Sequence, residues 1–191
     1  MGEVVEFPSN ESTGRGYLAT GTGAGPGVVV IHEWWGLVPH IEDVCDRLAA
    51  EGFTALAPDL FHGKTVPNSE PEAAEKEMMA LAVPRAAKDL SGAVDYLIGH
   101  PMVRGHGVGV VGFSMGGGLA LWLATLRADQ VRAVVPFYGA SPWPDAQPDW
   151  DRLTAPVEGH YGEAGGAAPE TAQHIQRELE LIAKEVMPAF R

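Results

Sequence analysis

The chain has 191 residues, of which 46% are hydrophobic, and this is enough for one folded domain, residues 1–191, with a substantial core. Its formal net charge of −12 argues against nucleic acid and anionic membrane surfaces as partners, because both select for clustered lysine and arginine. The single cysteine, Cys45, allows no intramolecular disulfide, and we see no targeting or membrane-spanning segment, so we expect a cytoplasmic protein that acts on a small molecule.

Short β-branched runs alternate with longer helical patterns along the chain, which is typical of an α/β fold built from crossover units. Residues 4–7 and 16–20 fit an antiparallel hairpin at the edge of a sheet. Runs such as VVVI and VGVVGF are apolar on both faces, as central parallel strands are. We predict the remaining strands at 27–32, 54–59, 108–113, 131–138 and 156–161.

The helices predicted between these strands have recognisable apolar faces. In the first, Ile41, Val44, Cys45 and Leu48 recur with helical spacing before a stop at Gly52, which places Cys45 in the core. Two more helices are expected from about Pro84 to Gly99 and at about 170–186. The polar segment FHGKTVPNSEPE forms an insertion that can overhang a site.

A serine lies at the junction of a predicted strand and a nearly all-apolar helix. Gly112-Phe113-Ser114-Met115-Gly116 matches the pattern G-x-S-x-G, in which the turn is so tight that larger side chains two positions either side would collide. The turn lifts the hydroxyl above the sheet, and the backbone N–H of Met115 faces the place where an oxyanion forms. We therefore interpret Ser114 as a nucleophile.

Two alternatives to this interpretation follow from the glycines. A glycine-rich packing turn with an incidental serine would leave Ser114 unlabelled by a serine-directed fluorophosphonate. A phosphate-binding loop is the second alternative, but the Lys-Ser/Thr pair of a P-loop and the G-x-G-x-x-G pattern are both missing at this turn.

The motifs IHEWWG, APDLF, GFSMGG and FYG occur in this order, and with them the chain resembles the dienelactone hydrolase family of α/β-hydrolases. The likeness covers roughly residues 16–163. It implies an α/β-hydrolase fold with a doubly wound, mostly parallel sheet, and hydrolysis of an ester or lactone through an acyl-enzyme without metal or cofactor.

The resemblance also implies roles for four residues. Ser114 matches the nucleophile, which is usually cysteine in the family, and Glu33 matches a glutamate that accepts the nucleophile's hydrogen bond. Trp34 and Met115 match the two residues whose backbone N–H groups form the oxyanion hole. From the residues alone, Glu33 at the end of an apolar strand already suggests a site, the alternative being a solvated strand-end carboxylate.

The other two members of a catalytic triad are not apparent. The family places an aspartate just beyond the GHYGE strand, where this chain has Ala164, Gly165 and Gly166 with only Glu163 nearby. The family's histidine follows one more strand, whereas the sequence ends at Arg191 directly after the last predicted helix. We therefore expect the last strand and the histidine loop to be absent, and an exposed sheet edge to favour self-association.

Four other histidines could replace the triad histidine, and each is more often structural than catalytic in such a position. His160 lies within a predicted strand, His174 is solvated, His32 points to the strand face opposite Glu33, and His62 lies on a loop that can overhang the site. A serine hydroxyl needs a base, and a glutamate with a pKa of about 4.3 is a poor one. We expect slow hydrolysis unless a partner chain supplies the histidine.

The pocket and its substrate follow from fewer signals. Trp34, Trp35 and Phe61, with His62 nearby, are expected to wall a pocket, core packing being the alternative. The family's arginine after the PDL motif has no counterpart in PDLFHGKT, so a neutral ester or lactone is as good a substrate as a dienelactone carboxylate. The competing hypothesis is a hydrolase-like binding protein without catalysis, or a truncated remnant.

Overall fold

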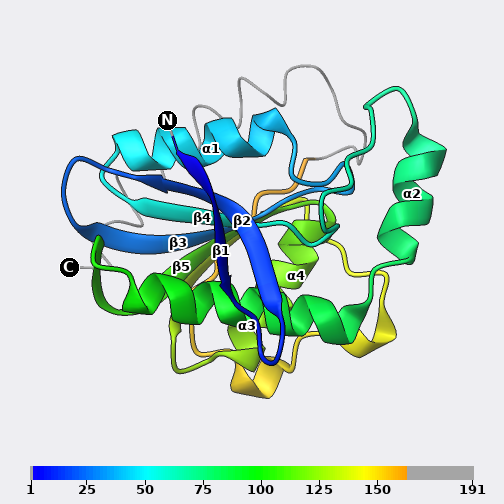
Figure 1. The fold of residues 1–191 in the computed structure, drawn as a ribbon. Helices are drawn as coiled ribbons and strands as arrows, with labels where there is room; N and C mark the ends of the chain where they lie inside the picture. Colours follow the sequence, from blue (N-terminus) through cyan, green and yellow to red (C-terminus); the bar gives the residue numbers. More distant parts are fainter. Residues whose placement is uncertain (1, 163–191) are drawn as a thin grey trace.

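The computed structural model describes residues 2–162, which form one sheet with helices packed on both faces (Figure 1). The strands run in the order β1-β2-β4-β3-β5-β6 across the sheet. β1 and β2 form the predicted antiparallel hairpin, and the other four strands are parallel to one another. Their bounds are β1 Glu3–Pro8, β2 Thr13–Thr20, β3 Gly25–Ile31, β4 Thr54–Pro58, β5 Val103–Phe113 and β6 Val131–Phe137.

Helices cover the two faces of the sheet because the central strands alternate their apolar side chains. Val28 and Val30 of β3 pack with α1 on one face, and Val29 and Ile31 pack with α3 and α4 on the other. Cys45 is fully buried on the α1 face, which confirms its predicted place in the core. The helices are α1 Pro39–Ala50, α2 Pro71–Met79, α3 Val83–Gly99 and α4 Met115–Leu126, with short 3₁₀ turns at Pro144–Ala146 and Trp150–Arg152.

The structure adds one helix that the sequence pattern did not predict. α2 begins at Pro71, within the segment taken as a polar insertion, and stands at one end of the molecule, away from the sheet (Figure 1). Only Ala74 of this helix is buried, so its sequence has no apolar stripe to mark it. β5 likewise begins five residues before its predicted start, at Val103.

The strand predicted at 156–161 is wrong as a continuous strand, since it pairs with β6 only through the isolated bridges Val134–Val157 and Phe137–His160. The hydrogen bonds around the gap are regular. The N–H of Glu158 donates to Val134 O and that of His160 donates to Pro136 O, both at 3.0 Å. Pro136 has no N–H to donate in return, and this interrupts the ladder.

Some predictions lie outside the described residues, namely the helix at about 170–186, His174 and the region 163–166. Within residues 2–162, no helix is both long enough and apolar enough to cross a membrane.

Candidate active site

Ser114 occupies the sharp turn between β5 and α4, in a conformation that residues other than glycine rarely adopt. Its φ is 53° and its ψ is −119°. Hydrogen bonds hold the turn from both sides: the Ser114 N–H donates to Phe137 O at 3.0 Å, and the Ser114 carbonyl accepts the Gly117 N–H at 2.9 Å. The strain is therefore held in place by β6 and by the first turn of α4.

The glycines around Ser114 allow the turn to pack closely against its neighbours. A Cβ atom on Gly112 would lie 2.0 Å from Gly116 O, and one on Gly116 would lie 2.3 Å from Ile31 O. These contacts confirm the collision predicted from the G-x-S-x-G spacing. They also show that the start of α4 touches the end of β3, where the segment with Glu33 and Trp34 begins.

The carboxyl group of Glu33 is bound by Tyr138, which follows β6. The Tyr138 O–H donates to Glu33 Oε1 at 3.0 Å. Burial raises the pKa of Glu33, while the hydrogen bond from Tyr138 and the charge of His40 act in the opposite direction. Among residues 2–162, Ser114 makes no hydrogen bond to Glu33, and the hydrogen bond that Glu33 accepts here comes from the tyrosine.

Tyr138 is a site residue that sequence reasoning missed. Burial, together with the nearby Glu33, raises its pKa, which keeps the phenol neutral and able to donate. Its own φ is 39°, and its N–H donates to His160 O at 2.7 Å. The sequence signal that could have identified Tyr138 is the FYG motif, which serves above only as a mark of the family.

Two backbone N–H groups, in the segments that follow β3 and β5, have no described hydrogen-bond acceptor. Among residues 2–162, the N–H groups of Trp34 and Met115 donate no hydrogen bond, unlike those of Ser114 and Gly117. Trp34 packs against the core and meets the Trp35 ring edge-on, with centroids 5.2 Å apart. This packing fixes the short segment that presents the Trp34 N–H.

Two of the histidines considered as substitutes, His32 and His160, pack against neighbouring residues. His32 is fully buried: its Nε2 accepts the Leu60 N–H at 3.2 Å, and its Nδ1 lies 2.6 Å from Glu33 O. This arrangement requires the neutral Nδ1–H tautomer, and burial lowers the pKa of His32. The His160 ring stacks on Phe137 with centroids 4.7 Å apart. Within the described part of the chain, no histidine is hydrogen-bonded to Ser114.

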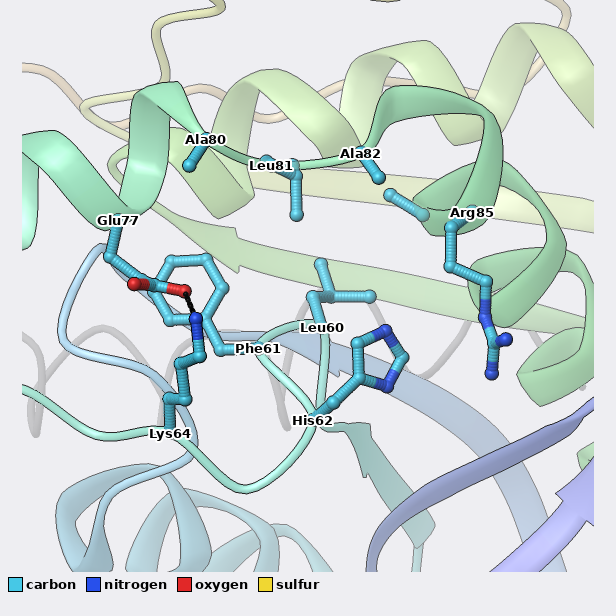
Figure 2. A pocket seen from close by; sticks show the side chains of 10 residues that line it. Leu60, Phe61, His62, Lys64, Glu77, Ala80, Leu81, Ala82 and Arg85 are labelled. Carbon is cyan, nitrogen blue, oxygen red and sulfur yellow. Dashed lines mark hydrogen bonds and ion pairs between the residues drawn. The ribbon is translucent and has the colours of Figure 1, made fainter.

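Two of the residues predicted to wall a pocket line one cavity. Phe61 and His62 line a cavity of about 210 Å³ between the 60–64 loop and the segment that joins α2 to α3 (Figure 2). Trp35 is not among its lining residues, and neither is Ser114. The Trp35 carbonyl instead accepts the Val66 N–H at 3.0 Å, which joins the loop after β3 to the loop after β4.

The described residues contain no group of three or more histidine, cysteine or carboxylate side chains placed to hold a metal ion.

Comparisons with known proteins agree on one family. The family model described as "Dienelactone hydrolase family" matches residues 15–187. "Protein usf" of Aquifex pyrophilus is 43% identical over 145 residues, and a "Putative carboxymethylenebutenolidase" of Aquifex aeolicus is 39% identical over 145 residues. Each alignment covers 73% of this chain and 62% of the relative, so the chain spans about three fifths of the length of these relatives.

The similarity extends to solved structures. A crystal structure titled "Putative Dienelactone Hydrolase", from Klebsiella pneumoniae, superposes with a TM-score of 0.73 at 26% identity. The match covers 96% of this chain and 81% of that one. The predicted fold class is thereby confirmed as the α/β-hydrolase fold of this family.

Proposed function

Because this chain belongs to the dienelactone hydrolase family, we propose that it hydrolyses a carboxylic ester or lactone through an acyl-enzyme on Ser114. The observation that supports this most is the strained turn at Ser114, with a φ of 53° between β5 and α4. Such strain persists only where surrounding structure enforces it, and it presents the hydroxyl at the edge of the sheet. Gly112 permits this turn, and Gly116 permits the close approach of α4 to the end of β3.

The proposed reaction has two steps. The Ser114 Oγ attacks the substrate carbonyl carbon. The oxyanion that forms accepts hydrogen bonds from the N–H groups of Trp34 and Met115. The C–O bond then breaks and the alkoxide takes the Ser114 proton back from Glu33; the alcohol departs from an ester but stays attached to the acyl group of a lactone. Water then attacks the acyl-enzyme, which frees the acid and returns a proton to Ser114. Glu33 is the carboxylate proposed to accept the Ser114 proton, and its raised pKa makes it a stronger base than an exposed glutamate.

A second candidate function is binding without catalysis, and one observation favours it. Among residues 2–162, no histidine reaches Ser114, and serine is a weak nucleophile without such a base. Enzymes of this kind that lack triad members retain roughly 10³ to 10⁴-fold acceleration over water. We therefore expect slow hydrolysis of this chain rather than none.

Hydrolysis of p-nitrophenyl acetate by the wild type and by Ser114→Ala tests the proposal. We expect slow release of p-nitrophenol by the wild type, at least ten-fold slower release by Ser114→Ala, and no change in Ser12→Ala, a serine in the turn between β1 and β2. Equal rates for the wild type and Ser114→Ala would refute the role of Ser114. Ordinary esterase rates that are lost in Ser114→Ala would show that a base is supplied and that the expectation of slow turnover is wrong.

The setting of this reaction is also proposed. The net charge of −12 disfavours nucleic acid and anionic membranes as partners, which leaves small neutral or singly charged esters and lactones. The one cysteine is buried and fits a reducing compartment, so we propose a cytoplasmic location. No cofactor is required by the proposed steps.

A further inference from the structure

The cavity in Figure 2 combines apolar walls with charged groups at its two ends. Leu60 and Phe61 form one wall, and Leu81 faces them from the segment between α2 and α3. An apolar cavity of about 150 Å³ already accepts benzene. A volume of about 210 Å³ therefore suits a ligand somewhat larger than a single unsubstituted ring.

One end of this cavity is closed by an ion pair. Lys64 Nζ lies 2.8 Å from Glu77 Oε1, and the Lys64 side chain is 68% exposed. An exposed pair of this kind contributes little to stability, but Glu77 offsets the charge of Lys64 and places a carboxylate beside the ligand space. This end therefore repels anions as much as it attracts them.

The other end holds a fixed guanidinium. Arg85 Nε lies 3.0 Å from both carboxylate oxygens of Asp89, and its Nη2 donates to Thr13 O at 2.7 Å. Asp89 is only 2% exposed and also accepts the hydroxyl of Ser9. Among residues 2–162, Arg85 Nη1 donates no hydrogen bond, and the Arg85 side chain lines this end of the cavity.

His62 stands beside Arg85 and faces the same space (Figure 2). Its Nε2 lies 3.4 Å from Asp89 Oδ2, and its side chain is 47% exposed. Its φ of 52° is unusual for a residue other than glycine. Backbone strain of this kind accompanies binding sites, and the imidazole here lies near the buried carboxylate and lines the cavity.

We propose that this cavity binds a small monocarboxylate with a compact apolar body. The carboxylate pairs with Arg85 Nη1 and with His62, and the body packs between Leu60 and Leu81. A guanidinium whose other nitrogens are already fixed loses little entropy when it binds a carboxylate. A dianion such as phosphate is disfavoured, because Lys64 and Arg85 are already paired with Glu77 and Asp89 and leave no excess positive charge to balance a second negative charge. The proposal does not depend on hydrolysis at Ser114.

Titration with benzoate, followed through the methyl NMR signals of leucine and alanine, tests this site. We expect saturable shifts of Leu60 and Leu81 with no shift of Leu123, which is buried in α4. Benzyl alcohol, which has nearly the same shape but no charge, should bind at least five-fold more weakly, and inorganic phosphate should not compete. Equal binding of benzoate and benzyl alcohol, or displacement by phosphate, would overturn the proposal.

Two substitutions at one position separate the cavity from the rest of the surface. Leu81→Trp fills the space and should abolish the benzoate shifts, whereas Leu81→Met conserves the volume and should preserve them. Lys64→Gln should change benzoate affinity less than two-fold, because Lys64 is paired with Glu77. Undiminished binding to Leu81→Trp would contradict the assigned position of the apolar body. Loss of binding in Lys64→Gln would contradict the assigned position of the carboxylate.

Discussion

Gly116 shows how one missing side chain sets the geometry around Ser114. A Cβ at this position would lie 2.3 Å from Ile31 O and 2.6 Å from His32 O, both of which are backbone atoms that cannot move aside cheaply. We expect Gly116→Ala to lower the free energy of unfolding by about 1–3 kcal/mol in urea denaturation. Gly99→Ala is the control, since a Cβ there meets nothing within 4 Å, and it should leave stability unchanged or slightly higher. Equal effects of the two variants would refute the close approach.

Tyr138 is predicted to help keep the Glu33 carboxyl group ionised. Its hydrogen bond lowers the pKa of Glu33 against the upward effect of burial, so its loss leaves the carboxyl harder to ionise. If hydrolysis needs ionised Glu33, the acidic limb of the pH–rate profile of Tyr138→Phe will move to higher pH. Rates measured from pH 4 to 9 check this, with Tyr161→Phe, an exposed tyrosine, as the control. An unmoved acidic limb would show that Tyr138 has only a structural role.

The site could be predicted from sequence only where its residues lie in local motifs. Ser114 and its glycines form one short motif, and Glu33 and Trp34 directly follow an apolar strand. The contact between Tyr138 and Glu33 joins residues 105 positions apart, and no spacing in the sequence reports it. Whether Glu33 accepts a proton from Ser114 stays a prediction.

At the scale of elements, prediction succeeded where burial imposes a period on the sequence. α1 and α3 each bury a stripe of side chains at helical spacing, and both were predicted. α2 buries a single alanine and leaves no such trace, although Pro71 marks its first turn. The prediction of a continuous strand after β6 is wrong because Pro136, in β6, lacks the N–H that a continuous ladder needs.

Asp89 is predicted to anchor α3 to the hairpin of β1 and β2. Its buried carboxylate accepts the Ser9 hydroxyl and pairs with Arg85, so truncation leaves a guanidinium without its partner. We expect Asp89→Ala to cost about 1.5–3 kcal/mol of unfolding free energy, the range for lost hydrogen bonds to a charged group. Asp95→Ala, on the same helix, removes a 65% exposed carboxylate that pairs with Arg127 and should cost less than about 1 kcal/mol. Chemical denaturation of both variants measures these losses of unfolding free energy. Similar losses in the two variants would contradict the anchoring role of Asp89.

At the scale of the whole molecule, the parallel sheet brings the proposed catalytic groups together. Glu33 follows β3, Ser114 follows β5 and Tyr138 follows β6, and these three strands are neighbours with their carboxyl ends at one edge. Segments far apart in the chain therefore meet without any long-range motif in the sequence. The cavity of Figure 2 lies by the loop after β4, on the other side of β3 from β5 in the strand order.

The central claim is that this fold presents Ser114 as a nucleophile, and covalent labelling tests it most directly. The wild type and Ser114→Ala are incubated in parallel with a fluorophosphonate, and their intact masses and labelled peptides are measured. We predict one adduct on the wild type, located at Ser114, and none on the variant. An unlabelled wild type, or an adduct that persists in Ser114→Ala, would contradict the account.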